Sequence, residues 1–400
     1  MRCMGSHLED SFADGTLVRP SHREAGIVHL VQAIAQLTGV KDIEPSPPMR
    51  ELTELIGRAH HLIFVLLDGL GMSTVRRLPA ASFIASHVRR QLIATCPSTT
   101  ACALTTVATA SFPNQHGISG WFTYLPELLT TATVLPFKER FTGQPLVERG
   151  IRPQDVLRLP PILPRMTHRA LTVTPSNIAN TTYNHFCRGG TAGVGYDTIP
   201  HAVDRIIEEV RSAKGPTYTH LYLPEIDTIC HHLGVDHPDV VPKVMQIDRE
   251  IGRLAEAVAG RATLVLSADH GLIDVPRDDQ TFLFPGDPLL DLLLVPPTGD
   301  ARMPVFHVHE RGRDSFAQQF VTRFGDRMHL VSTDEAERME LFGPGAFAAQ
   351  ARPHFGDFIA FPYRPATLAY HGADKSVGNV FLAVHAGLSP QEMWVPLCVA

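Results

Sequence analysis

The sequence predicts an α/β protein with a central, mostly parallel sheet, helices on both faces of that sheet, and a small α+β insertion. Apolar runs of strand length, such as residues 61–67 and 262–266, alternate with helical patterns, which is typical of parallel sheets. These runs are apolar throughout, as expected for strands that are covered on both faces. After residue 275 the alternation gives way to short, mixed elements, and this change indicates the insertion.

The first 59 residues are expected to form a helical extension. Residues 25–37 carry Ile27, Leu30 and Ile34 at helical spacing, and the proline-rich residues 44–48 are expected to be a linker. The predicted division is an N-terminal helical extension at residues 1–59, a catalytic core at 60–290 and 362–400, and a small α+β insertion at 291–361.

The remaining elements follow from apolar spacing and from stop signals. A helix over residues 240–258 places its apolar residues on one face and ends at Gly260. Further strands are expected at residues 171–174, 219–223, 305–309 and 328–332, and further helices at 202–210, 314–324 and 333–341. Residues 357–361 belong to the predicted insertion, and the chain ends on the apolar residues 394–399.

Composition excludes several classes of protein. The 400 residues are 44% hydrophobic and 19% charged with a net charge of −6, so a basic surface for a nucleic-acid polymer is not expected. No segment has the length and apolarity of a signal peptide or a membrane span, which predicts a cytoplasmic location. The six cysteines lack paired spacing, so neither a disulfide scaffold nor a cysteine zinc site is indicated. Nothing in the sequence indicates an oligomeric state.

Three predicted strands run into an aspartate. Asp68, Asp227 and Asp269 follow strand ends, where open α/β sheets bind ligands. His231 lies four residues after Asp227, so the two would share one face if this segment is helical, and His270 follows Asp269 directly. With His371, the set contains three carboxylates and three imidazoles, and this number of ligands suits two zinc-like ions. The full set of expected metal ligands is Asp68, Asp227, His231, Asp269, His270, His371 and the hydroxyl of Thr100.

A polar turn at residues 96–99 precedes a helix of small residues. A threonine there would lie where helical N–H groups are unpaired and the helix dipole is positive, which favours an alkoxide and a phosphoryl group. Threonine before a helix is also a common N-cap, so the turn alone leaves both roles open for Thr99 and Thr100.

The order of these motifs resembles the alkaline phosphatase superfamily, and most closely its nucleotide pyrophosphatase/phosphodiesterase branch. The resemblance extends from residue 60 to the C-terminus. The matching motifs are Leu67-Asp68-Gly69, Pro97-Ser98-Thr99-Thr100 with His116-Gly117-Ile118, Asp227 with His231, Ser267-Ala268-Asp269-His270-Gly271, and His371-Gly372-Ala373-Asp374.

The resemblance implies a metal-dependent phosphoric ester hydrolase, a phosphodiesterase or nucleotide pyrophosphatase, acting on a small phosphate ester. It implies two divalent ions, with zinc as the expected element. One ion would be held by Asp227, His231 and His371, and the other by Asp68, Thr100, Asp269 and His270. Thr100 is the implied nucleophile, because the family pattern places that residue three positions after the proline.

One position departs from the family pattern. Trp121 stands where the phosphodiesterase branch has an asparagine that donates to a phosphate oxygen. The Trp121 indole, Asn177, Asn180 or Arg188 could supply that donor. The alternatives therefore include a phosphomonoesterase or a phosphonate hydrolase. A non-catalytic binding protein is disfavoured by the complete ligand set. Trp121, Phe122 and Tyr124 are expected at the substrate pocket, which favours a diester.

Overall fold

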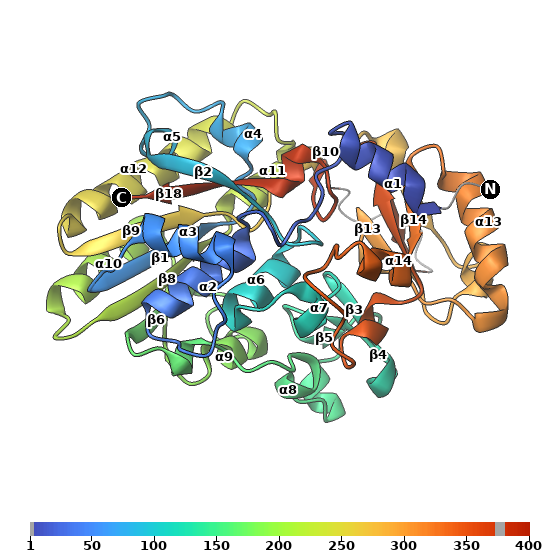
Figure 1. Ribbon diagram of the computed structural model, residues 1–400, viewed down its shortest axis with the longest axis horizontal. Coiled ribbons are helices and arrows are strands. Elements are labelled where there is room, and N and C mark those ends of the chain that lie inside the picture. Colours follow the sequence, from blue (N-terminus) through green and yellow to red (C-terminus); the bar gives the residue numbers. More distant parts are fainter. Residues whose placement is uncertain (1–3, 373–380) are drawn as a thin grey trace.

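The computed structural model describes residues 4–372 and 381–400. It contains two seven-stranded sheets, and helices pack around them (Figure 1). The larger sheet has the strand order β2-β18-β9-β1-β8-β6-β7. Its strands are β1 (His61–Leu67), β2 (Val88–Ile93), β6 (Arg169–Pro175), β7 (Ala192–Tyr196), β8 (Thr217–Leu223), β9 (Ala262–Ser267) and β18 (Trp394–Val399).

The larger sheet is mostly parallel, which confirms the predicted fold class. Strand β1 pairs in parallel with β8 and β9, and β6 pairs in parallel with β7 and β8. Strand β18 runs antiparallel to both β2 and β9. All seven residues of β1 are buried, because strands and helices surround it.

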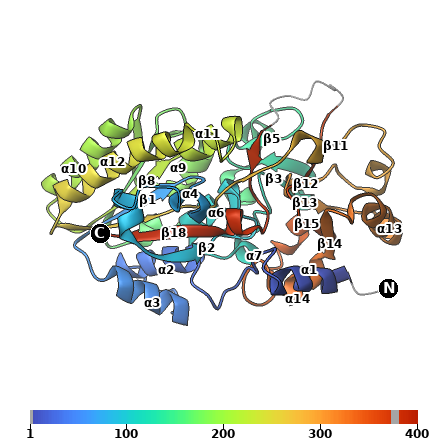
Figure 2. The ribbon, with the colours of Figure 1, turned by 90° about the horizontal axis from the view of Figure 1, so that it is seen from above.

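Helices cover both faces of this sheet. Figure 2 shows α10 (Ile199–Ser212) and α12 (Val240–Val258) on one side, and α2 (Ile27–Leu37) and α3 (Pro47–Ile56) on the other. The buried residues of α12 recur at helical spacing, so one face of this helix packs on the core. The other helices are α1 (Met4–Ala13), α4 (Met72–Val75), α5 (Phe83–His87), α6 (Thr100–Thr109), α7 (Pro113–His116), α8 (Pro153–Val156), α9 (Thr182–Arg188), α11 (Glu225–Leu233), α13 (Arg313–Phe324), α14 (Thr333–Arg338) and α15 (Pro390–Met393).

The proline-rich stretch is not a linker as predicted, because its second half begins helix α3. Ser46 is the N-cap and accepts a hydrogen bond from the backbone N–H of Met49. Pro47 occupies the first helical position, where its missing N–H costs no hydrogen bond. The prolines therefore start a helix that packs beside α2.

The second sheet combines two distant parts of the chain. Its strand order is β14-β15-β13-β12-β3-β4-β5. Residues 122–139 supply three of these strands, so residues 291–361 do not form this sheet alone, and the predicted domain boundaries stay a prediction. The strands are β3 (Phe122–Leu125), β4 (Thr130–Thr133), β5 (Lys138–Glu139), β12 (Thr298–Asp300), β13 (Met303–Phe306), β14 (Met328–Ser332) and β15 (Phe358–Pro362).

Two short pairings complete the strand inventory of the described chain. Strand β10 (Ile273–Asp274) pairs with β17 (Ala383–Val384), and β11 (Gln280–Leu283) pairs with β16 (Thr367–Tyr370). Within residues 4–372 and 381–400, no helix has the length and apolarity needed to cross a membrane.

Candidate active site

The carboxyl ends of three neighbouring strands bring the predicted aspartates together. Asp68 follows β1, Asp269 follows β9, and Asp227 lies in the first turn of α11, just after β8. Because β1 lies between β8 and β9, these residues meet at one edge of the sheet. A backbone hydrogen bond joins two of them: the N–H of Asp227 donates to the carbonyl oxygen of Asp68 at 3.1 Å.

Asp68, Asp269 and His270 form the first group of possible metal ligands. Each side chain offers an atom within 4.8 Å of the others. His270 Nε2 lies 3.5 Å from Asp68 Oδ1 and 3.4 Å from Asp269 Oδ2. All three residues are buried. Burial, together with the negative charge of Asp269, holds the pKa of Asp68 well above its usual range. A cation between these groups would relieve that repulsion.

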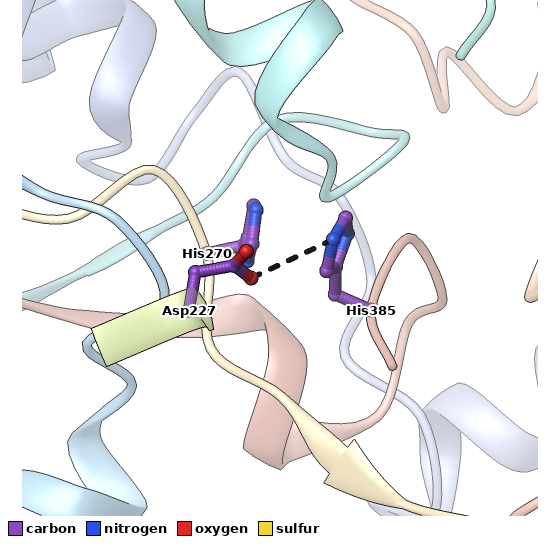
Figure 3. A group of neighbouring side chains, drawn as sticks. All are labelled: Asp227, His270 and His385. Atoms are coloured by element: carbon purple, nitrogen blue, oxygen red, sulfur yellow. Dashed lines mark ion pairs between the residues drawn. The ribbon is translucent and has the colours of Figure 1, made fainter. Parts of the chain in front are cut away.

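Asp227, His270 and His385 form the second group (Figure 3). His385 Nε2 lies 3.8 Å from Asp227 Oδ1, and His231 Nε2 lies 3.2 Å from Asp227 Oδ2. The rings of His270 and His385 are stacked, with centroids 3.8 Å apart. Burial and the adjacent His270 lower the pKa of His385 well below its usual range, so its imidazole is neutral, as a metal ligand requires.

The three histidines at these groups are oriented in the same way. His231 Nδ1 lies 2.7 Å from the carbonyl oxygen of Ala383, and His385 Nδ1 lies 3.2 Å from that of Ser98. His270 Nδ1 lies 3.1 Å from the carbonyl oxygen of its neighbour, residue 271. When Nδ1–H donates to a carbonyl, Nε2 keeps its lone pair for a metal ion.

Thr100 is the first residue of α6 and lies beside both groups. Its Oγ1 is 3.1 Å from His270 Nε2. Thr99 is the N-cap residue of this helix, although its side chain makes no capping hydrogen bond. The Thr100 hydroxyl therefore lies at a helix N-terminus, where unpaired N–H groups favour an anion.

His371 is not among the residues that the structure brings together. Its backbone N–H donates to Leu283, and its ring packs near Phe282 and Phe284. His385, rather than His371, lies in the group with Asp227 and His270. Residues Ala373 and Asp374 of the His371 motif lie outside the described residues. The sequence around His385 is His385-Ala386-Gly387. The sequence alone does not distinguish this histidine from the other histidines of the chain, 21 in all, as the one that lies at the strand ends.

A cavity of about 500 Å³ opens beside Asp68, Thr100 and Asp227. Trp121 lines it, as predicted, and so do Asn177 and Arg188. Three other residues that were expected near the substrate are not in its lining: Asn180, Phe122 and Tyr124.

Strands of the second sheet hold the two aromatic residues away from the cavity. The Tyr124 ring packs edge-on against His307, with centroids 4.8 Å apart. The ring of Phe122 lies under the guanidinium of Arg140.

The backbone of Trp121 is fixed by a residue that sequence reasoning missed. Its N–H donates to Asp300 Oδ2 at 2.9 Å. Asp300 ends strand β12, which reaches this position from the second sheet. Burial raises the pKa of Asp300 to about 6. No local pattern in the sequence connects residues 121 and 300, because their contact depends on the pairing of β3 with β12.

Comparison with known proteins confirms the resemblance seen in the motifs. Residues 62–375 match the family described as type I phosphodiesterase / nucleotide pyrophosphatase. Murine ectonucleotide pyrophosphatase / phosphodiesterase 5 has a similar fold, with a TM-score of 0.63 at 17% identity over 84% of this chain and 87% of that chain. An inactive threonine-to-alanine variant of the murine protein, in complex with AMP, gives 0.62 at 16% identity over 85% and 87%.

A phosphonate-cleaving enzyme has a similar fold as well. Phosphonoacetate hydrolase from Sinorhizobium meliloti, in complex with phosphonoformate, gives a TM-score of 0.61 at 18% identity over 85% of this chain and 89% of that chain. No curated protein sequence matches the chain.

Proposed function

We propose that this chain, which belongs to the type I phosphodiesterase / nucleotide pyrophosphatase family of metal-dependent phosphoric ester hydrolases, cleaves phosphodiester or pyrophosphate bonds. In this proposal Thr100 is the nucleophile. The protein binds two divalent ions, which are expected to be zinc. One observation carries this proposal. The Thr100 hydroxyl lies 3.1 Å from His270 Nε2, and that nitrogen also faces the carboxylates of Asp68 and Asp269. A hydroxyl in such a ligand group has the neighbours that activation requires.

The residues fit a pair of divalent ions. Within the described part of the chain, one oxygen of each aspartate, Asp68 Oδ1, Asp227 Oδ1 and Asp269 Oδ2, is buried without a hydrogen-bond partner. Buried carboxylate oxygens are costly unless a cation or donor neutralises them. In our proposal one ion is held by Asp227, His231 and His385, and the other by Asp68, Asp269, His270 and the Thr100 oxygen.

Thr100 would form a covalent intermediate. When bound, the ions would lower the pKa of the Thr100 hydroxyl and neutralise the charge of the phosphoryl oxygens. Thr100 Oγ1 attacks phosphorus, its bond to phosphorus forms as the bond to the leaving oxygen breaks, and the leaving group departs. Water then attacks the same phosphorus and releases Thr100. The inactive threonine-to-alanine variant of the murine neighbour supports a threonine nucleophile.

The cavity favours a diester over a monoester. A diester needs room for a second substituent, and the cavity of about 500 Å³ beside Thr100 offers it. A monoester carries more negative charge and would need a further cation. Arg188 lines the cavity, but its Nη1 lies within 1.8 Å of the position that a Cβ on Gly193 would take, so its guanidinium packs over strand β7. Hydrolysis of a phosphonate is the second candidate, favoured by the similarity in fold to phosphonoacetate hydrolase.

An acid-quench experiment tests the nucleophile. The zinc-reconstituted protein is mixed with thymidine 5′-(4-nitrophenyl phosphate), quenched in acid, digested and analysed by mass spectrometry. We expect a nucleotidyl adduct on the peptide that contains Thr100, and none in Thr100→Ala. An adduct on Thr99 would shift the nucleophile by one residue, and turnover without any threonine adduct would refute the covalent mechanism. Absence of both turnover and adduct would favour the non-catalytic binding protein.

A further inference from the structure

The turn that precedes strand β3 packs directly on the end of strand β12. Figure 2 shows the two strands side by side, and they pair at Phe122 and Gly299. Gly120 has a φ of +153°, and a Cβ on it would lie 2.6 Å from the carbonyl carbon of Gly299 and 2.6 Å from Asp300 Oδ2. Only glycine allows so close an approach at this position. The approach brings the Asp300 carboxylate to the backbone of Trp121.

Both backbone polar groups of Trp121 are bound by other parts of the second sheet. Its N–H donates to Asp300 Oδ2 at 2.9 Å, and its carbonyl oxygen accepts a hydrogen bond from the N–H of Val134 at 3.1 Å. A hydrogen bond to a carboxylate is stronger than one between neutral groups. Gly120 directly precedes Trp121 and restricts the chain little by itself. The Asp300 carboxylate therefore fixes the Trp121 backbone on the side where the chain is most pliable.

The same carboxylate faces the start of helix α6. Burial raises the pKa of Asp300, whereas the Trp121 N–H and the Thr99 hydroxyl lower it, so both donors face the carboxylate. The Thr99 side chain makes no capping hydrogen bond to its own helix, which agrees with its position beside Asp300. Asp300 therefore lies between the start of the helix that carries Thr100 and the turn that carries Trp121.

Trp121 forms part of the wall of the cavity that Thr100 also lines. Its indole offers a large, flat apolar surface and one N–H donor. A side chain that is already held in its binding position loses less freedom when a ligand binds, and this raises affinity. A fixed backbone at Trp121 would therefore favour binding of a substrate group that contacts the indole.

We propose that Asp300 is a positioning residue, whose carboxylate holds the Trp121 backbone so that the indole keeps its place beside the second ester group of the substrate. The inference rests on the proposed function and adds a residue of the second sheet to that site. Asp300 belongs to neither group of possible metal ligands among the described residues. It therefore acts on substrate binding through Trp121, and not on the metal content.

Tryptophan fluorescence tests the link between Asp300 and Trp121 without substrate or metal. The chain has two tryptophans, so Trp394→Phe leaves Trp121 as the only one. In this background, Asp300→Ala should raise the acrylamide quenching constant, because the Trp121 backbone loses its anchor. Asp300→Asn should keep the parent value, since its amide oxygen can accept the same N–H. The matched control is Asp278→Ala, at an exposed aspartate. An unchanged constant in a folded Asp300→Ala protein would overturn the proposal.

Steady-state kinetics of the zinc-reconstituted protein tests the effect on the substrate, thymidine 5′-(4-nitrophenyl phosphate). Asp300→Ala should lower kcat/KM by about tenfold, the equivalent of one hydrogen bond to a charged group, and mainly through a higher KM. Asp300→Asn should restore most of the loss, and Asp278→Ala should cause none. Elemental analysis should find the zinc content of Asp300→Ala unchanged. Loss of an ion, or a fall in kcat at constant KM, would contradict a role in positioning.

A double-mutant cycle shows whether Asp300 acts through Trp121. If it does, Asp300→Ala should have no further effect on kcat/KM in a protein that already carries Trp121→Ala. Effects of the two substitutions that simply multiply would show that Asp300 acts elsewhere, and would overturn the proposal.

Two measurements separate this inference from a failure to fold and from the proposed function. If Asp300→Ala does not fold, time-resolved anisotropy of the Trp394→Phe protein decides, because a ring held as proposed moves only with the whole molecule, and fast motion of the Trp121 ring would overturn the proposal. If the unaltered protein hydrolyses no ester, the proposed function fails, and acrylamide quenching still tests the link between Asp300 and Trp121.

Discussion

Replacing Arg302 with methionine should lower the free energy of unfolding by about 3–5 kcal/mol. Arg302 is 1% exposed and lies between β12 and β13. Its Nε and Nη2 donate to the two carboxylate oxygens of Glu392, each at 2.8 Å. Its Nη1 donates to the carbonyl oxygens of Arg364 and Ala366, each at 3.0 Å. The substitution would leave a buried carboxylate without its counterion, and that accounts for the size of the loss.

The Glu392 carboxylate also holds the loop that carries His385. It accepts hydrogen bonds from the backbone N–H groups of Gly387 and Ser389 and from the Ser389 hydroxyl. The Arg302–Glu392 pair therefore connects the second sheet to the loop of a proposed metal ligand. Metal affinity should fall together with stability in Arg302→Met.

Urea unfolding of the metal-free protein, followed by circular dichroism, measures the loss. The control is Arg327→Met, because Arg327 pairs with the exposed Asp326, and its removal should leave the unfolding curve unchanged. Adding Glu392→Gln to Arg302→Met should recover part of the loss, because no unpaired charge then remains. A loss below about 1 kcal/mol in Arg302→Met would refute this reasoning.

Two further predictions concern turnover. Thr100→Ala should lower kcat by roughly 10³-fold or more while the far-ultraviolet circular dichroism is retained, whereas Thr99→Ala should lower kcat only mildly. Steady-state kinetics compares the two variants. A larger loss in Thr99→Ala than in Thr100→Ala would show that the nucleophile is Thr99. On matched nitrophenyl esters, kcat/KM should be higher for a diester than for a monoester. Trp121→Ala should lower the rate of diester hydrolysis more than it lowers the metal content. A monoester preference that disappears in Arg188→Ala would reverse the assignment of a diester as substrate.

The central strands could be predicted closely from the sequence. The bounds of β1 are those expected for residues 61–67, and the bounds of α12 are those expected for residues 240–258. A strand covered on both faces is apolar at every position, and a long amphipathic helix repeats its pattern many times, so both signals are strong.

The second sheet could not be assembled from local patterns. Strands β3, β4 and β5 are short, and β4 consists of three threonines and one alanine. Their stability depends on pairing with β12, which lies far away in the sequence. Such pairing leaves no periodic signal in a window of ten or twenty residues.

Some residues of the candidate site could likewise be predicted from the sequence, and others could not. Asp68, Asp227 and Asp269 could be predicted because each follows a strand, and the topology of a parallel sheet brings strand ends together. His385 lies on a loop whose position is set by contacts with residues such as Glu392, and the sequence motifs pointed to His371 instead. Asp300 was missed for the same reason, since the second sheet carries it to Trp121.

Metal content after reconstitution tests the proposed two-ion centre most directly. The protein is stripped with a chelator, reloaded with zinc, desalted and measured by elemental analysis, alongside His385→Ala and His371→Ala. We predict two ions per chain in the unaltered protein, one in His385→Ala and two in His371→Ala, because His385 lies at the second ligand group and His371 does not. One ion or none in the unaltered protein, or loss of an ion in His371→Ala but not in His385→Ala, would contradict this account.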